Sequence, residues 1–195
     1  MWDDRYSQQE YAYGKLPNDF LRDNIHYLRK GTSLCLADGE GRNSVFLAEQ
    51  SHQVTSIDSS APGIQKAKQL AQEKQVDIHA EVADLEHYVI TENAWDNIVS
   101  IFCHLPVELR RKVHQSVVQG LKPGGIFLLE AYTPEQIGLG TGGPAVAEMT
   151  MSLELLSAEL KGLEFIYAQE KQRNVTEGMY HTGVGAVVQL IARKP

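Results

Sequence analysis

The chain has 195 residues, 43% of them hydrophobic and 22% charged, which favours a single domain over residues 1–195 with a sizeable core. Eighteen basic against 25 acidic residues give a formal net charge of −7, which argues against a nucleic acid or an anionic membrane as partner. No apolar run is long enough to span a bilayer, the polar start is not a signal peptide, and two cysteines make no disulfide framework. We therefore expect a cytoplasmic protein.

Residues 1–30 combine an aromatic-rich start with a predicted helix. Asn18 follows Pro17 and is a good helix cap, and apolar residues then recur at three- and four-residue spacing up to about Arg29. We expect Trp2 and Tyr6 to pack this helix against the sheet.

The next stretch has the most informative spacing in the chain. A predicted strand over Ser33–Ala37 runs into a turn with Gly39 and Gly41, a short helix pattern follows, and a second apolar strand ends at Asp58. Glycines let the backbone approach a ligand closely, and a carboxylate after the second strand can accept hydrogen bonds from both hydroxyls of a ribose. This arrangement predicts a site for a nucleoside-bearing cofactor. A dinucleotide fingerprint would need a third glycine where Ser44 stands, which argues against NAD(P).

Strands and helices alternate along the rest of the chain, and two consecutive strands follow at the end. We expect helices after Ser60 and from Pro106 to Gly120, a long glycine-rich loop over 133–150, a short helix over 152–160, and strands over 53–57, 77–83, 97–102, 126–132, 163–174 and 183–193. In such a sheet, ligands bind at the carboxyl ends of the strands, where Gly39, Asp58, Asp84 and Phe102 are expected to converge.

Five motifs in this order resemble the class I S-adenosylmethionine (SAM)-dependent methyltransferases: Ala37-Asp-Gly-Glu-Gly41, the Asp58 carboxylate, Ala83-Asp-Leu85, Trp95-Asp96 with its strand, and Leu121-Lys-Pro-Gly-Gly125. The sequence departs from the family at Ala37, where a glycine is usual, and at Cys35, where the family has an acidic residue that helps hold the methionine end of the cofactor. Asp38 and Glu40 are candidates for that duty. The resemblance implies a Rossmann-like, doubly wound α/β sheet in the order 3-2-1-4-5-7-6, with strand 7 antiparallel and helices on both faces.

The N-terminal motifs Trp2-Asp-Asp-Arg-Tyr6 and Glu10-Tyr-Ala-Tyr-Gly14 narrow the resemblance to small bacterial methyltransferases related to tellurite resistance and, more distantly, to thiopurine methyltransferases. This resemblance implies methyl transfer from SAM, with S-adenosylhomocysteine as product, to a small acceptor such as a thiol or a selenium or tellurium species. It also implies that residues 1–30 cover the cofactor as a lid, with Tyr13 as the best lid residue, and that loop 133–150 lies near the acceptor site.

The candidate site residues follow from these motifs. We expect the cofactor to contact the following residues: Tyr13, Ala37, Asp38, Gly39, Gly41, Arg42, Asp58, Ser59, Asp84, Leu85 and Phe102. The candidate general bases are His104 and His181, because histidine titrates near neutral pH. Arg173, Glu177 and His181 either line an acceptor pocket or form a solvated hairpin. The seven histidines and two cysteines have no metal-ligand spacing, so we predict no metal.

Two other functions stay open on the sequence. Cys35 at the position of the usual carboxylate leaves room for a non-catalytic SAM-binding sensor or interaction protein. An NAD(P)-dependent oxidoreductase is the other alternative. The acceptor molecule, and whether the protein is a monomer or a homodimer, are not determined by the sequence.

Overall fold

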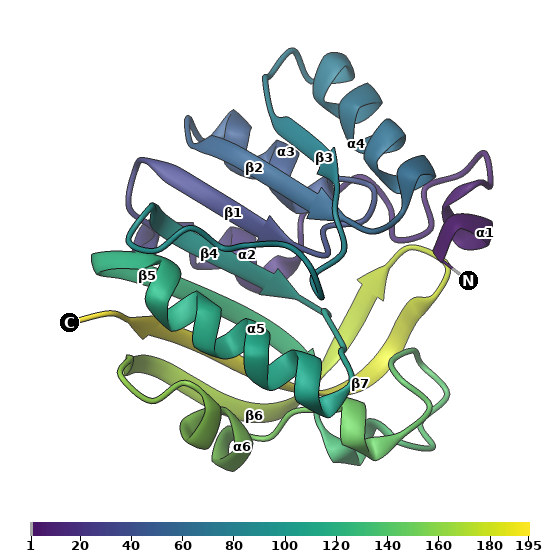
Figure 1. The fold of residues 1–195 in the computed structure, drawn as a ribbon. Coiled ribbons are helices and arrows are strands. Elements are labelled where there is room, and N and C mark those ends of the chain that lie inside the picture. Colours follow the sequence, from purple (N-terminus) through teal and green to yellow (C-terminus); the bar gives the residue numbers. More distant parts are fainter. Residues whose placement is uncertain (1) are drawn as a thin grey trace.

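The computed structural model describes residues 2–195 and is built around one seven-stranded sheet in the order β3-β2-β1-β4-β5-β7-β6 (Figure 1). The strands are β1 (Thr32–Leu36), β2 (Gln53–Asp58), β3 (His79–Val82), β4 (Trp95–Ile101), β5 (Leu121–Tyr132), β6 (Glu164–Glu177) and β7 (His181–Arg193). β7 pairs antiparallel with both β5 and β6, whereas β1 to β5 pair in parallel. The strand order that the resemblance implied is confirmed.

Helices cover both faces of the sheet (Figure 1). The α-helices are α1 (Trp2–Tyr6), α2 (Asp19–Asp23), α3 (Arg42–Glu49), α4 (Ala61–Glu73), α5 (Val107–Gly120) and α6 (Leu153–Glu159), and the 3₁₀ turns are η1 (Ile25–Tyr27), η2 (Pro134–Gln136) and η3 (Ala147–Met149). Side chains alternate across the pleat of a strand. Leu34 of β1 therefore packs in the core under α5 and α6, and its neighbour Cys35 packs in the core under α2 and α3.

The first long helix predicted from the sequence is broken in the structure. We expected one helix from Asn18 to about Arg29, but α2 ends at Asp23 and a 3₁₀ turn follows. Asn24 causes the break locally, since its side-chain Nδ2 donates to the Phe20 carbonyl at 2.9 Å and competes with continued helix bonding. Leu21 and Leu28 are nevertheless buried as predicted, because both arrangements turn them toward the sheet.

The order in which strands are added to the sheet reverses between β1 and β4, which pair in parallel. α3 follows β1 and packs on one face, whereas α5 follows β4 and packs on the other. This crossing is the topological switch point, where open α/β sheets bind ligands at the carboxyl ends of their strands. The predicted convergence of Gly39, Asp58 and Phe102 on this edge is therefore consistent with the topology.

The last two strands form a long hairpin that reaches past the sheet toward the start of the chain (Figure 1). Its tip at Gly178–Tyr180 touches the N-terminal segment, where Met179 N donates to the Ala12 carbonyl at 3.0 Å. Both strands are longer than the sequence predicted. Among residues 2–195, no helix has the length and apolar character needed to cross a bilayer.

Candidate functional site

The turn after β1 depends on a left-handed backbone at three alternate positions. Ala37, Gly39 and Gly41 have φ values of 47°, 60° and 85°, and Gly41 caps α3. A Cβ on Gly41 would lie 2.5 Å from the Cβ of Ala67 on α4, so only glycine lets α4 come this close. Alanine at the first position accepts the left-handed conformation at some steric cost. The turn thus has the backbone shape that the glycine spacing predicted.

Asp58 closes this turn from the end of β2. Its Oδ2 accepts from Gly39 N at 2.9 Å, and its Oδ1 accepts from Ser60 N at 2.8 Å. Burial raises the pKa of the carboxyl group, and the two backbone amides oppose that shift. A carboxylate has about four acceptor positions, and these two backbone amides use two of them. Asp58 therefore fixes the turn through its side chain.

The N-terminal segment, residues 2–14, lies directly over the turn. Tyr6 is buried against Gly39 and Gly63, and Ser60 Oγ donates to Asp3 Oδ1 at 2.6 Å. Trp2 is 44% exposed and stacks on Tyr6 with ring centroids 5.6 Å apart. Our expectation that Trp2 and Tyr6 pack the first helix on the sheet is therefore wrong. Gly39 and Gly63 have no side chains, so the Tyr6 ring packs directly against their backbone.

Glu40 anchors the same segment from within the turn. Its Oε2 accepts from Ala12 N at 2.8 Å, and its Oε1 pairs with Lys66 Nζ at 2.7 Å. Lys66 in turn donates to the Glu10 carbonyl at 2.7 Å. The other acidic residue of the turn, Asp38, accepts from Ser56 Oγ at 2.9 Å, and burial raises its pKa to about 6. Glu40 and Asp38 were the candidates to replace the acidic residue that the family has at position 35. Both side chains thus already have partners within the protein.

Arg42, the first residue of α3, joins a buried network of charges. Its Nη2 pairs with Glu177 at the end of β6, and its Nη1 is buried without a hydrogen-bond partner. Glu177 also pairs with Arg173 at 3.2 Å and accepts from Asn18 at 2.8 Å. Although burial alone would raise the pKa of Glu177, Arg42 and Arg173 lower it overall, so Glu177 is ionised. Glu177 and His181 are therefore buried and Arg173 is partly buried, so these three residues are not part of a solvated hairpin.

Four rings gather where β4, β5 and β7 end or begin. Phe102 follows β4 with a left-handed φ of 51°, which is uncommon for a bulky residue. Its ring stacks on Tyr132 at 4.6 Å and meets His181 edge-on at 4.8 Å. His104 stacks on Tyr132 at 5.7 Å. Both histidines predicted as candidate bases thus lie beside Phe102, at the edge of the sheet that holds the glycine turn.

The two histidines differ in what their ring nitrogens do. His104 Nδ1 lies 2.9 Å from the Met149 carbonyl and Nε2 lies 3.3 Å from Tyr132 N, so the neutral ring donates through Nδ1 and accepts through Nε2. Burial lowers its pKa to about 4. His181 is also buried, which lowers its pKa to about 3, but its Nδ1 has no partner. Of the two, only His181 has a buried nitrogen without a partner.

Tyr13 connects the N-terminal segment to this cluster of rings. Its ring lies 4.5 Å from His181, and its hydroxyl accepts from Arg5 Nη1 at 2.6 Å. The structure thus brings the predicted lid residue to the side of the site that is lined by β7.

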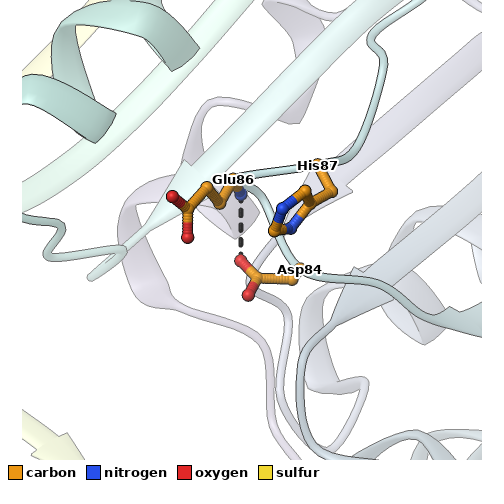
Figure 2. Close-up of side chains that lie close together, drawn as sticks. All are labelled: Asp84, Glu86 and His87. Carbon is orange, nitrogen blue, oxygen red and sulfur yellow. Dashed lines mark hydrogen bonds between the residues drawn. The ribbon is translucent and has the colours of Figure 1, made fainter.

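The remaining predicted residues lie on the side of the site away from β7. Ser59 follows β2, and Asp84 and Leu85 follow β3. Asp84 is exposed, and its Oδ1 accepts from Glu86 N at 2.9 Å within a turn (Figure 2). The preceding Ala83 N donates to the Asp58 carbonyl at 2.9 Å, so this turn adjoins Asp58. Asp84, Glu86 and His87 place ligand atoms within 4.8 Å of one another, but all three are exposed and the bond within the group stabilises the turn. This geometry alone does not make a metal site.

Residues 34–125, which hold the glycine turn, Asp58 and Asp84, match the family model described as a methyltransferase domain. This part of the chain is similar to a methyltransferase domain. The resemblance to class I SAM-dependent methyltransferases is therefore confirmed. A curated relative, the 2-heptyl-1-hydroxyquinolin-4(1H)-one methyltransferase of Mycobacteroides abscessus, is 28% identical over 109 residues, which are 54% of this chain and 48% of that protein. The chain thus spans about half the length of this relative.

Solved structures show the same methyltransferase fold. TehB from Haemophilus influenzae superposes with a TM-score of 0.76 and 19% identity, over 100% of this chain and 66% of that one. A SAM-dependent methyltransferase from Methanosarcina mazei superposes with a TM-score of 0.67 and 19% identity, over 88% of this chain and 96% of that one. At such identities the likeness concerns the fold and not the acceptor.

Several residues of this site were not predicted from the sequence. Glu130 is fully buried on β5 and pairs with Arg173 at 2.7 Å, and Tyr132 stands at the end of the same strand. Asn18 donates to both Glu130 and Glu177 besides capping α2. A lone charged residue inside the apolar run Ile126–Tyr132 was the available signal for Glu130, because an unpaired charge is costly in a buried strand.

Proposed function

We propose that this protein is a SAM-dependent methyltransferase that modifies a small-molecule acceptor and releases S-adenosylhomocysteine. The observation that carries the proposal is the geometry of Asp58, which holds the glycine turn through two backbone amides and keeps acceptor positions for two ribose hydroxyls. The match of residues 34–125 to a methyltransferase family model supports it.

The residues present fit both ends of the cofactor. Asp58 suits the ribose, and the unpartnered Nη1 of Arg42, beside the glycine turn, suits the carboxylate of the methionine end. When bound, the cofactor supplies a methyl group already activated on a sulfonium. The protein then has to orient the acceptor and exclude water, and the N-terminal segment and the hairpin tip enclose the site for this purpose.

Two acceptor classes have support. The N-terminal motifs resemble the tellurite-resistance branch, and TehB is a structural neighbour, which favours a thiol or a selenium or tellurium species. The relative from Mycobacteroides abscessus is a hydroxyquinolinone methyltransferase, which instead favours a hydroxyl on a heteroaromatic ring. The acidic net charge of −7 argues against a nucleic-acid acceptor. We also propose a cytoplasmic location, and assembly as monomer or homodimer stays open.

A second candidate is a SAM-binding sensor without turnover. The observation that favours it is Cys35, which is 1% exposed and has no charge to offer the cofactor, since burial raises the pKa of its thiol. An NAD(P)-dependent oxidoreductase is less well supported, because Ser44 stands in place of the third glycine.

Turnover separates these functions. The purified protein is incubated with SAM and a panel of thiols, phenols, selenite and tellurite, and S-adenosylhomocysteine is measured by mass spectrometry, with Asp58→Asn as the control variant. Acceptor-dependent product from the wild type, reduced at least about 100-fold in the variant, supports the proposal. Tight SAM binding with no product from any acceptor favours the sensor.

A further inference from the structure

Buried polar atoms without partners concentrate at one place in the molecule. Within residues 2–195, four buried side-chain atoms have no hydrogen-bond partner: Arg42 Nη1, Trp95 Nε1, Tyr132 Oη and His181 Nδ1. Trp95 lies at the start of β4, at the end of the sheet opposite the site. The other three belong to the site, and leaving a buried polar group without a hydrogen-bond partner destabilises the fold. Such groups persist where a ligand completes them.

Tyr132 and His181 form the closest pair among these groups. Their rings meet edge-on with centroids 5.3 Å apart, and Phe102 contacts both of them. Tyr13 flanks His181 at 4.5 Å. The pair therefore lies beside flat ring surfaces, which suit a flat ligand.

The glycine-rich loop covers the pair. A Cβ on Gly142 would lie 2.6 Å from His181 Cδ2 and 3.2 Å from Tyr132 Oη, so the loop backbone rests on both rings. Gln136 Nε2 holds this stretch through the Gly142 carbonyl at 2.9 Å. Access for a ligand to the two polar atoms therefore requires this loop to move.

Of the groups around His181, one carboxylate favours the protonated ring, and the cationic or titratable groups oppose it. The groups that act on it are Glu177 from β6, Arg42 from α3, His104 after β4 and Arg5 from α1. His181 is neutral at physiological pH because burial lowers its pKa, and Glu177 stabilises the ring once it gains a proton. Burial raises the pKa of Tyr132, so its hydroxyl keeps its proton and acts as a hydrogen-bond donor.

We propose that Tyr132 and His181 bind the methyl acceptor, and that this acceptor is a flat ring carrying an ionisable hydroxyl or thiol. The proposal rests on the proposed methyltransferase function and names its substrate class. It excludes chalcogen oxyanions such as tellurite as the main acceptor, because these have neither a flat ring to place between the aromatic side chains nor a hydroxyl or thiol on it for His181 to deprotonate.

The chemistry balances with these two residues. The hydroxyl or thiol of the acceptor gives its proton to His181 Nδ1, and Tyr132 Oη donates a hydrogen bond to the resulting anion. A lone pair of that oxygen or sulfur then forms the new bond to the methyl carbon. The bond between this carbon and the sulfonium breaks with its electron pair staying on sulfur, which becomes a neutral thioether. The protonated His181, stabilised by Glu177, later releases its proton to water.

The test compares acceptors that do and do not need a base. Phenol is protonated at neutral pH, whereas 4-nitrothiophenol is already a thiolate. We expect His181→Gln to lower kcat with phenol about 100-fold and to leave kcat with 4-nitrothiophenol within about 3-fold. Tyr132→Phe should lower kcat with both acceptors about 10-fold, because both anions lose one donor. The matched control His79→Gln, an exposed histidine of β3, should change neither rate.

Binding measurements keep the result interpretable. Calorimetry with SAM should give the same Kd for the wild type and all three variants, and 4-nitrophenol should bind saturably to the wild type loaded with S-adenosylhomocysteine. Equal losses of His181→Gln with both acceptors, no loss at all, or methylation of tellurite without binding of any flat probe would overturn the proposal. Failure of the wild type to bind SAM would instead refute the proposed function itself, and the acceptor proposal with it.

Discussion

At the scale of single residues, we propose that Asp58 and Arg42 bind the two ends of the cofactor. Asp58 lies on the ribose side of the glycine turn, and Arg42 lies on the side of the buried charge network. Arg42 keeps its Nη2 paired with Glu177, so the free Nη1 points to a carboxylate from outside the protein. In this proposal Arg42 binds the methionine end of the cofactor in place of the acidic residue that Cys35 replaces.

The Arg42 assignment predicts a difference between two ligands. Arg42→Ala should weaken SAM binding about 10–100-fold, because a charge-assisted hydrogen bond is lost. It should leave the binding of 5′-methylthioadenosine, which lacks the amino-acid end, within about 2-fold. Calorimetric titration measures both, with the exposed Arg22→Ala as control. Equal weakening of both ligands would mean that Arg42 only supports the fold of the turn.

His104 predicts a pH dependence of stability. Its pKa is about 4 in the folded protein and about 6.5 in the unfolded chain, so between these values the unfolded chain binds the extra proton. Stability therefore falls as pH falls through this window. Chemical denaturation should show that wild-type unfolding free energy drops about 2 kcal/mol more between pH 7 and pH 5 than that of His104→Gln. The raised pKa of Asp38 makes its contribution to stability increase as pH falls, but this contribution is the same in the wild type and in His104→Gln. Identical drops would show that His104 is not held neutral.

At the scale of elements, the N-terminal segment, the hairpin tip and the glycine-rich loop enclose the edge of the sheet. Glu40 binds the segment through Ala12 N and Lys66, and the tip binds it through Met179 N. These contacts come from distant parts of the sequence, so the segment closes only when the whole fold is present.

Breaking the Glu40 anchor should loosen the segment. Glu40→Gln removes a buried ion pair with Lys66, whereas Glu73→Gln removes an exposed pair with Lys15. We expect trypsin to cut within residues 1–15 about 10-fold faster in Glu40→Gln, with weaker SAM binding, and at the wild-type rate in Glu73→Gln. Limited proteolysis followed by mass spectrometry measures this. An unchanged rate in Glu40→Gln would show that the ring contacts alone hold the segment.

The elements also show which parts of the site the sequence could predict. Gly39, Gly41 and Asp58 belong to one continuous strand–turn–helix–strand unit, so local spacing placed them correctly. Tyr6 could not be placed, because its partner surface is made by Gly39 and Gly63 from two other elements. The apolar spacing could not predict the helix break at Asn24, because a continuous helix and a broken one bury the same apolar residues. Glu130 and Arg173 meet across strands whose register the sequence does not state.

At the scale of the whole molecule, the order of strands followed from the alternation of elements and the family resemblance together. The alternation predicts a parallel sheet with helices on both faces, and the resemblance adds the antiparallel β7. The identity of the acceptor does not follow from the fold, because the same sheet serves many reactions. It has to come from the side chains at the carboxyl edge, above all Tyr132 and His181.

The central claim is that the carboxyl edge of this sheet binds SAM through Asp58. Calorimetric titration of the folded protein with SAM tests it most directly, alongside Asp58→Asn and the exposed control Asp77→Asn. We predict saturable binding by the wild type and by Asp77→Asn, and at least about 100-fold weaker binding by Asp58→Asn. No binding by the wild type, or equal binding by Asp58→Asn, would contradict the claim.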